Sequence, residues 1–486
     1  MKQMKFSSRS ATSVAVAILC LGASATAFAQ VEAKVTGRVQ FDARVNDNSF
    51  NVLADRDSAS AADNFEIRRA RVGVAGTINK DIGYEVVGNG VGGSTNWIDT
   101  AFINYGFNKK AQIRTGRFKQ PFSLEEQTSS NNIDFMERSY GNQMVPGKRL
   151  GAMMHGEPMT GLTYGVSVYQ DGFNELTNQN SIGNKSAARL TLNFAQLNDI
   201  KDTVLHVGAG YTGGDSQVIA TSSGNTQETA SVKTRATVVA LRSENRGTAN
   251  VYRAQIGGDT LNTATYNGSA NNASTINQKM RGIEFAGARG PFKFQMETFD
   301  SKYSASGIHE TLATSGAETR SLAVQVKAQY LEFMYNITGE SWADSYKGGA
   351  FGGIKPKTNF MTDYGGVVGN GTGAWQVGYR ASKYTSNLAN TATCTGLTGT
   401  DCETAYATGT TTAKDYSRAQ NAETATTNTY ALNWILNSNS RVMFNYAETK
   451  FGQSIILLDV NKTSATYASG TTDKERVISV RTQINF

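Results

Sequence analysis

Cysteine, proline and histidine are all scarce in this sequence, which has 3, 5 and 3 of them among 486 residues. Beyond residue 29 it also contains no run of eighteen apolar residues, which excludes membrane-spanning helices. The histidines, His155, His206 and His309, have no partner four residues away and no nearby carboxylate cluster. A metal site is therefore not expected, and no motif calls for a cofactor.

Two of the cysteines, Cys394 and Cys402, lie close together in the segment CTGLTGTDC. In an oxidising compartment they could close a short loop through a disulfide. Two free thiols are the alternative. A metal site at this position would need further ligands, and no histidine lies nearby.

The first 29 residues have the pattern of a secretory signal peptide. Lys2, Lys5 and Arg9 precede a short apolar run, and Ala27-Phe28-Ala29 forms a small-residue cleavage signal. The run is too short for a comfortable membrane helix, the competing interpretation. We therefore expect a signal peptide at 1–29 and a single domain at 30–486, because no linker of distinct composition divides the rest.

Removing the signal peptide takes away three positive charges and leaves 47 − 3 = 44 basic against 40 acidic residues, a net charge of +4. This balance is far from the concentrated basicity of a nucleic-acid binder. Nucleic acid is therefore not an expected partner. Any preference for anions must come from the positions of the charges.

The chain is rich in strict alternation of apolar and polar residues. From Lys34, KVTGRVQFDARV places Val35, Val39 and Val45 on one side and charged residues on the other. Roughly sixteen such segments, most near ten residues long, recur along the chain. Ten tilted residues cross a bilayer as a strand, whereas strands of soluble sandwiches average five or six. The sequence predicts an all-β fold, a transmembrane antiparallel barrel of about 16 strands.

The chain end and the aromatic residues support a membrane barrel. The last segment places Ile478, Val480, Thr482, Ile484 and Phe486 on one face. A terminal amphipathic strand ending in phenylalanine resembles the signal read by the outer-membrane barrel-assembly machinery. The aromatic residues expected on the lipid-facing side, where girdles form, are Tyr164, Phe194, Tyr330, Trp375, Tyr379, Tyr430, Trp434 and Tyr446.

If the apolar faces meet lipid, the polar faces line the lumen. Alternation assigns to the lumen the basic residues Arg38, Arg44, Arg69, Arg71, Arg189, Lys293, Lys327, Arg380, Arg441 and Arg481. The acidic residues assigned there are fewer: Asp42, Glu85, Glu284 and Glu297. This excess favours an anion-attracting channel, because rings of basic side chains favour anions in narrow pores. The alternative is a polar, water-facing wall without selectivity.

Motifs for other activities are weak. GNGVGGST at 88–95 lacks the Gly-Lys-Ser/Thr ending of a phosphate loop, so we interpret it as a hairpin turn. No G-x-S-x-G accompanies the histidines, so an enzyme is not expected, although an enzymatic barrel stays open. The polar segment 213–278 is expected to hold one or two strands, around RATVVAL and VYRAQI, between extended loops that face water.

Several motifs are similar to those of the phosphate-selective porins of the O/P family, across nearly the whole mature chain. The most specific is IRTGRFKQPFSLEEQTSSNNIDFMERS; others are FEIRRARVGVAGTINKDIGYEV, KRLGAM, MYNITGESWADSY and GAWQVGYRASKY. The resemblance implies a bacterial outer-membrane homotrimer of sixteen-stranded barrels surrounded by lipid. It also implies a third loop that folds into the lumen, where basic residues bind the passing anion.

The block from Arg117 to Arg149 matches this third loop. The candidate anion-binding residues are Arg114, Arg117, Lys119, Ser129, Ser130, Arg138, Lys148 and Arg149. Strict alternation places Arg117 and Lys119 on the lipid side, so the strand either bulges near Gly116 or has ended there. The loop also carries carboxylates that would pair with the basic residues: Glu125, Glu126, Asp134 and Glu137.

The sequence therefore predicts a porin for passive diffusion of small anions, with inorganic anions of the phosphate class as partners. Two alternatives remain open. One is a general diffusion porin without a selective site. The other is a structural or adhesive barrel, which the long Thr/Asn-rich loops favour.

Overall fold

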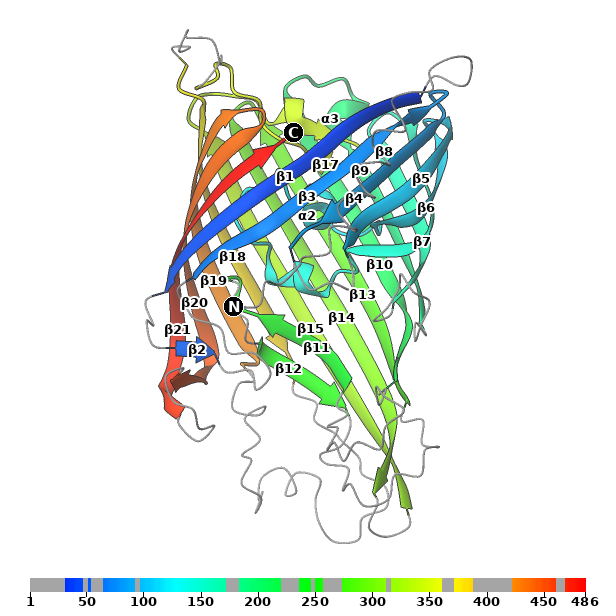
Figure 1. The fold of residues 1–486 in the computed structure, drawn as a ribbon, viewed down its shortest axis with the longest axis vertical. Helices are drawn as coiled ribbons and strands as arrows, with labels where there is room; N and C mark the ends of the chain where they lie inside the picture. The colour runs from blue at the N-terminus through cyan, green and yellow to red at the C-terminus, as the bar shows by residue number, and fades with distance from the viewer. Residues whose placement is uncertain are drawn as a thin grey trace, which may run out of the picture.

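Sixteen antiparallel strands close into a barrel in the computed structural model of the protein (Figure 1). The structure describes residues 31–46, 51–53, 64–91, 97–171, 183–219, 236–245, 250–256, 273–311, 316–360, 371–387, 422–459 and 468–486. The expected signal peptide and the cysteine pair Cys394 and Cys402 lie outside these residues, so both remain predictions.

The barrel strands are β1 (Val31–Asn46), β3 (Asn64–Ile78), β4 (Ile82–Asn89), β5 (Ile98–Asn108), β6 (Ala111–Lys119), β7 (Lys148–Met159), β8 (Leu162–Gln170), β9 (Asn184–Asn193), β10 (Thr203–Ile219), β13 (Ala273–Arg289), β14 (Phe292–Thr311), β15 (Gly316–Asn336), β18 (Ala374–Ser386), β19 (Thr424–Asn437), β20 (Ser440–Asp459) and β21 (Ala468–Asn485). The sheet contains 17 strands because the three-residue β2 (Asn51–Leu53) also pairs with β20. None of the helices in the described residues is long and apolar enough to cross a membrane.

The barrel closes where the first strand pairs with the last. β1 is hydrogen-bonded to β3 on one side and to β21 on the other, so no strand edge is left open to lipid. The terminal residue completes this seam, since the Phe486 amide donates to the Gly37 carbonyl at 3.1 Å and the Gly37 amide donates back at 2.8 Å. The Phe486 ring stays exposed on the outer face.

The barrel wall shows the alternation of apolar and polar residues that the sequence predicted. In β1, Val35, Val39 and Val45 are exposed on the outside, whereas Gln40 and Asp42 are fully buried inside. The exposed apolar face suits lipid and the polar face suits an aqueous lumen. The prediction of an antiparallel transmembrane barrel of about 16 strands is confirmed.

Aromatic residues gather on the outer face of the last strands, as predicted. Trp375 and Trp434 stack with ring centres 5.1 Å apart, and Tyr430 lies 5.2 Å from Tyr379 and 6.3 Å from Tyr446. Such aromatic residues sit at the boundary between hydrocarbon and water.

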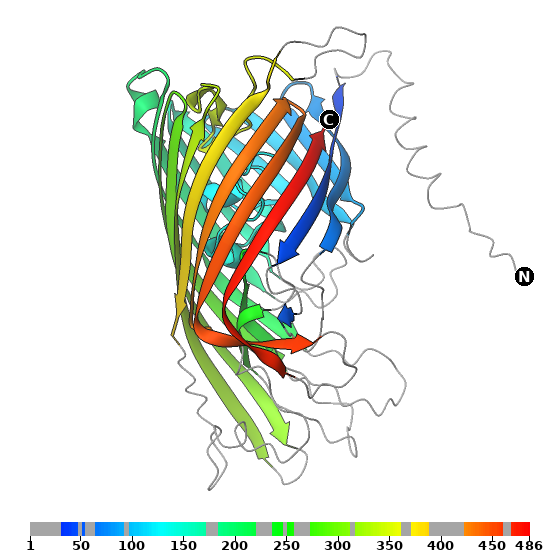
Figure 2. The ribbon, with the colours of Figure 1, turned by 90° about the vertical axis from the view of Figure 1, so that its left-hand side faces the viewer.

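The two ends of the barrel differ in their connections. Short turns join β3 to β4, β5 to β6 and β7 to β8 at the end that carries the C-terminus (Figure 1). In outer-membrane barrels short turns are periplasmic and longer loops extracellular, so this end is periplasmic. Toward the other end, the 20-residue β14 and the 21-residue β15 extend beyond the shorter strands (Figure 2, yellow-green).

The faces of β14 and β15 exchange polarity along their length. Toward the periplasmic end, Phe294 and Phe333 are exposed outside while Glu332 is buried inside. Toward the extracellular end, with the register unbroken, Val326 is buried inside and Lys327 is exposed outside. The inner face is apolar there because loops fill the lumen, and the outer face is polar because it rises above the hydrocarbon.

This exchange overturns two predictions. Lys327, assigned to the lumen from its polar neighbours, lies on the outer face. Tyr330, assigned to the lipid-facing girdle, is buried in the lumen, where its hydroxyl donates to Glu297 at 2.6 Å. Both errors come from assuming that apolar always means lipid-facing, which fails where the lumen itself is packed.

Three segments fill part of the lumen. We call residues 120–147, between β6 and β7, the inner loop; it holds α2 (Leu124–Gln127) and the 3-10 helix η1 (Tyr140–Met144). The inner hairpin is β11 (Ala236–Arg242) with β12 (Asn250–Ile256). The periplasmic insert, which the structure describes over residues 337–360 and 371–373, contains η2 (Ala343–Ser345), β16 (Tyr346–Lys347) and β17 (Ala350–Phe351).

The inner hairpin and the periplasmic insert each pack on the inner loop through an apolar core. On the extracellular side, Tyr140 of the inner loop joins Leu241 and Tyr252 of the inner hairpin in one buried cluster. On the periplasmic side, Phe135 of the inner loop joins Trp342 of the periplasmic insert in another. The prediction of one or two strands around RATVVAL and VYRAQI is confirmed by β11 and β12, which pack against the inner loop.

Gly116 decides how β6 leads into the inner loop. The strand runs to Lys119, and its register with β7 is unbroken. It therefore neither bulges at Gly116 nor ends there, contrary to both predicted alternatives. Gly116 instead has a φ of 122°, and a Cβ there would lie 2.2 Å from the Ala101 carbonyl oxygen. Only glycine adopts this conformation readily.

Candidate pore constriction

The inner loop is held in the lumen at the start of α2. The amides of Leu124 and Glu125 donate to the two carboxylate oxygens of Glu297 on β14 at 2.9 and 2.7 Å. Ser123 caps the helix, since its hydroxyl accepts from the Glu126 amide at 3.3 Å. A carboxylate is favourable here because the first amides of a helix lack partners within it.

Side chains of the last strands bind the backbone of the inner loop. Arg441 donates to the Ile133 carbonyl at 2.9 Å and Arg481 to the Met136 carbonyl at 2.7 Å. Asn433 donates to the Asp134 carbonyl at 2.9 Å. The loop therefore spans the lumen from β6 and β7 to the β19–β21 wall, as Figure 1 shows for the segment around α2.

The carboxylates of the inner loop pair with basic residues of the wall. Glu125 lies 3.3 Å from Arg380, and Asp134 forms an ion pair with Lys293. Lys293 is also paired with Glu332 at 3.2 Å. These basic side chains were predicted to attract anions, and they also fix the loop.

Glu137 is the most heavily paired of these carboxylates. Its ion-pair distances are 3.1 Å to Arg68, 3.3 Å to Arg44 and 3.3 Å to Arg481. Burial alone would raise the pKa of Glu137, but the three guanidinium groups hold that pKa well below its usual value. Glu137 therefore stays charged throughout the neutral and mildly acidic range.

Replacing Glu137 by glutamine is expected to weaken the docking of the inner loop by about 2 kcal/mol, because it removes the carboxylate paired with Arg68 and one of the carboxylates paired with Arg44 and Arg481. A loss of about 2 kcal/mol corresponds to an opening equilibrium about thirty times larger. The rate of amide hydrogen exchange in residues 131–139 should therefore rise about thirtyfold. The control is Glu448→Gln, which removes the exposed outer pair with Arg476. Equal exchange in both variants would rule out Glu137 as an anchor.

The same carboxylate gives the loop a defined pH dependence. Because the pKa of Glu137 is lower in the folded channel than in the unfolded chain, its stabilisation is complete above the usual value of 4.5. It is lost only as the pH falls through the lowered pKa. We therefore expect Glu137 to cause no increase in loop exchange between pH 7 and pH 5.

Lys119 lies at the C-terminal end of α2. Its ammonium group donates to the carbonyls of Glu126 and Gln127 and, at 2.9 Å, to that of Thr128. Lysine is favourable there because the last carbonyls of a helix lack partners. Arg138 donates to the same Thr128 carbonyl at 2.8 Å and pairs with Glu126 at 3.0 Å.

Five cations interact where the inner loop faces β1 and β3. We call Arg38, Arg71, Lys119, Arg138 and Lys148 the constriction cluster. Asp99 lies 2.7 Å from Arg71 and also pairs with Lys148. With Glu126 and the more weakly interacting Glu85, three carboxylates face five cations, a net charge of 5 − 3 = +2.

Within this cluster Arg38 hydrogen-bonds neutral groups. It donates to the Ser130 hydroxyl and the Asn131 side-chain oxygen, both at 2.6 Å. Arg69, which lies two residues before Arg71 on β3, donates to the Gln40 side chain at 2.7 Å. Within the described part of the chain, neither arginine has a carboxylate at ion-pair distance, so both keep an uncompensated charge.

The remaining predicted site residues have partners outside this cluster. Ser129 accepts from the Asn131 amide at 3.3 Å within the inner loop. Arg149 pairs with Asp171 at 3.1 Å. Arg114 stacks on Phe102 with its guanidinium carbon 4.4 Å from the ring centre. Arg117 pairs in register with Ala101 of β5 and Leu150 of β7.

Other predicted lumen residues serve the periplasmic insert and the wall. Arg189 pairs with Glu284 at 2.8 Å and donates to the Gly349 carbonyl of the insert at 2.7 Å. Arg44 and Arg481 both bind the buried Asp42, each with a contact of 2.7 Å. These arginines have a structural role in the wall, because carboxylates neutralise their charges.

Among the described residues, alternation missed several lumen acids and the lumen cations Arg68 and Lys185, the latter buried with its ammonium group 2.9 Å from the Gln278 side-chain oxygen. The pairing of β1 with β3 shifts between Gln40 and Phe41, and Arg68 is the additional residue of that bulge. Its side chain therefore reaches Glu137 in the lumen. Glu66, Glu244 and Glu332 also lie in lumenal ion pairs. The adjacent charges of the RRAR segment were the only signal for Arg68.

A closed sixteen-stranded barrel with an apolar outer face, a polar inner face and a loop crossing the lumen defines the class of outer-membrane porins, and the protein is a channel of the bacterial outer membrane. The chain belongs to the family of phosphate-selective porins O and P, whose sequence profile matches residues 33–486. No curated protein sequence matches the chain.

Solved outer-membrane proteins resemble the chain in structure at low sequence identity. The outer-membrane channel DcaP of Acinetobacter baumannii is 11% identical, with a TM-score of 0.47 and coverage of 94% of this chain and 97% of that one. OmpT of Vibrio cholerae, solved in a trimer form, is 8% identical, with a TM-score of 0.46 and coverage of 94% and 99%. OprB of Pseudomonas putida is 8% identical, with a TM-score of 0.45 and coverage of 93% and 94%.

Proposed function

We propose that this porin conducts small anions passively, with phosphate-class oxyanions as its preferred substrates. The observation that carries this proposal is the constriction cluster, whose net charge of +2 includes the uncompensated Arg38, together with the uncompensated Arg69. Arginine suits a phosphate-class ligand because its planar guanidinium can form two parallel hydrogen bonds with an oxyanion. The family name supports the same substrate class.

The mechanism requires exchange of hydrogen bonds and no catalysis. An anion approaching the cluster can replace the Ser130 and Asn131 oxygens as partners of Arg38. The lost contacts join the charged guanidinium to neutral oxygens, whereas the new contacts join it to an anion, so that both partners are charged. Binding stays weak because the displaced groups compete for the same guanidinium, and weak binding permits release.

The expected selectivity is moderate. A net charge of +2 about 8 Å from the passing ion contributes about 1 kcal/mol in a water-like dielectric. Salt screening at a Debye length of about 8 Å reduces this value, which leaves a permeability ratio of about fivefold for anions over cations. The many neutralised lumen cations explain why a larger ratio is not expected.

The test is the zero-current potential of purified channels in a planar bilayer under a potassium chloride gradient. The proposal predicts the sign of potential set by chloride, with an anion-to-cation ratio of about five. Equal permeability to potassium and chloride would leave the general diffusion porin as the correct function. Absence of any channel current would favour the structural or adhesive barrel.

We further propose that the channel assembles as a homotrimer, as the family resemblance implies. Delivery would use residues 1–29 as a signal peptide, and insertion would use the terminal Phe486 as the segment read by the barrel-assembly machinery. The seam at Phe486 and Gly37 gives that residue a second, structural role. Native mass spectrometry of the purified protein tests the trimer through its mass.

A further inference from the structure

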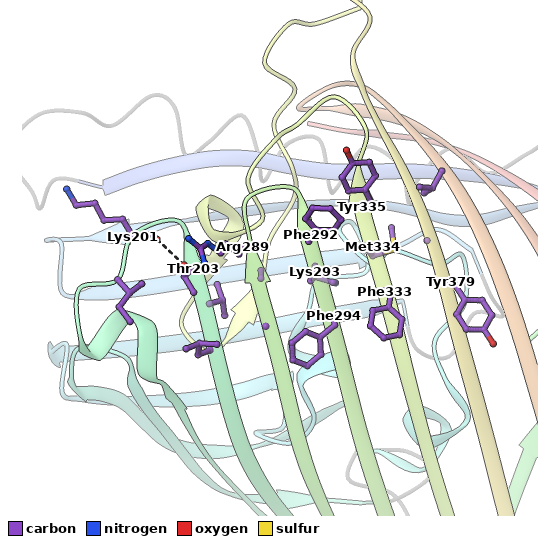
Figure 3. A pocket seen from close by; sticks show the side chains of 17 residues that line it. Lys201, Thr203, Arg289, Phe292, Lys293, Phe294, Phe333, Met334, Tyr335 and Tyr379 are labelled. Carbon is purple, nitrogen blue, oxygen red and sulfur yellow. Dashed lines mark hydrogen bonds between the residues drawn. The ribbon is translucent and has the colours of Figure 1, made fainter.

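An apolar groove of about 960 Å³ crosses the outer face of the barrel near its periplasmic end (Figure 3). Strands β10, β13, β14, β15 and β18 form its floor. The side chains of Leu205, Phe294, Phe333 and Val377 line it and are between 39% and 51% exposed. The groove therefore opens sideways into the region that hydrocarbon occupies.

Gly287 shapes the floor of this groove. It lies on β13 opposite Leu205 of β10 and opposite Phe294 of β14. A Cβ at Gly287 would lie 2.3 Å from the Phe294 ring. Because Gly287 has no side chain, the Phe294 ring lies against the barrel wall at this point. This leaves a hollow, whereas large side chains cover the wall on either side of it.

The periplasmic end of the groove is basic. Thr203, at the start of β10, lies opposite Arg289 at the end of β13, and its hydroxyl donates to the Lys201 carbonyl at 3.0 Å. Lys201 and Arg289 have no ion-pair partner within the residues that the structure describes. The nearest acidic residue in sequence, Asp202, accepts a hydrogen bond from Ser341 of the periplasmic insert.

Aromatic rings stand beside this basic end. Phe292 and Tyr335 lie with their ring centres 4.7 Å apart and are both exposed. Figure 3 shows them at the same end of the groove as Arg289, with Phe294 and Phe333 farther along it. Aromatic rings of this kind mark the boundary between hydrocarbon and headgroups, so the basic pair lies at headgroup depth.

We propose that this groove binds one phospholipid of the periplasmic leaflet. Its acyl chain lies along Leu205, Phe294 and Phe333, and its phosphate is bound by Lys201 and Arg289. A lipid fits better than a second copy of the chain, because the site combines a narrow apolar hollow with two cations at a single end. A free oxyanion would use the cations and leave the apolar hollow unexplained.

The headgroup is tested by native mass spectrometry of the whole protein titrated with palmitoyl-oleoyl phosphatidylglycerol. The Lys201→Gln/Arg289→Gln variant should bind the tightest lipid about tenfold more weakly, since each basic residue near an anionic headgroup contributes to attraction. The matched control is Lys302→Gln/Lys327→Gln, which removes two cations from the outer face of β14 and β15 at the extracellular end. Equal binding by both variants would overturn the proposal.

The groove is tested by Leu205→Trp, which fills the hollow and keeps both cations. This variant should lose the tight lipid while folding normally, as judged by the heat-dependent mobility of the barrel in gel electrophoresis. Dioleoylglycerol, which has acyl chains without phosphate, should not compete, and neither should 10 mM inorganic phosphate, a concentration on the order of a weak oxyanion site. Displacement of the lipid by either probe, or unchanged lipid binding by Leu205→Trp, would contradict a site that binds both the acyl chain and the phosphate of a phospholipid. A disulfide-linked dimer of Phe333→Cys would instead identify a second copy as the occupant.

Discussion

Channels carrying Arg38→Gln and Arg69→Gln together are expected to lose their preference for anions, because the anion-to-cation permeability ratio falls about fivefold, to about one. These two arginines hydrogen-bond neutral partners. Their removal therefore takes positive charge from the constriction without leaving a carboxylate unpaired. The zero-current potential in a salt gradient measures the change.

The matched control is Lys327→Gln, because Lys327 carries the same charge but lies on the outer face. It should leave the permeability ratio unchanged. A control variant that alters the ratio as much as the double variant would show that overall protein charge sets selectivity. Lys119→Glu is a less direct test, since its carboxylate would face the α2 carbonyls that now accept from Lys119 and would disturb the loop itself.

Replacing residues 339–372 of the periplasmic insert by a short turn is expected to raise single-channel conductance about twofold, because lumen width limits ion flow. The insert occupies the lumen between the inner loop and the periplasmic exit, where Trp342 and Phe351 are buried. Strands β15 and β18 already pair from Asn336 to Gln376, so a short connection suffices. Current steps in planar bilayers measure the conductance.

The control for this replacement is Ser341→Ala, which removes the hydrogen bond from the insert to Asp202 and the one that the Ser341 hydroxyl accepts from the Ala343 amide, and leaves the insert in place. Its conductance should equal that of the native channel. If the replacement variant also kept native conductance, the insert would have no part in limiting ion flow. Increased current noise in that variant would follow from loss of the buried contact between Trp342 and the inner loop.

The wall of the barrel was predictable because each strand carries its own pattern. Exposed valines and buried polar residues alternate in β1 as the sequence suggests, and the last strand places Phe486 outward. The pattern misled where the lumen is apolar, at Lys327 and Tyr330, and at the bulge that contains Arg68. A sequence alone does not state which medium fills the inside of a barrel at each depth.

The position of the constriction in the sequence was predictable, but the partners of its charged side chains were not. The inner loop was recognised from its motif, yet Glu125 meets Arg380 across a separation of 255 residues, and Arg481 meets Asp42 across 439. Such contacts depend on how the loop crosses the lumen. Alternation did not predict Arg68 as a lumen residue, because a bulge in β3 adds one residue to the strand and turns the Arg68 side chain to the inner face.

Titration of single-channel chloride current with phosphate tests the central claim most directly. An anion channel with a weak oxyanion site predicts a chloride current that falls with added phosphate and saturates, and a weaker effect in the Arg38→Gln/Arg69→Gln channel. A chloride current that stays constant at all phosphate concentrations would contradict the account.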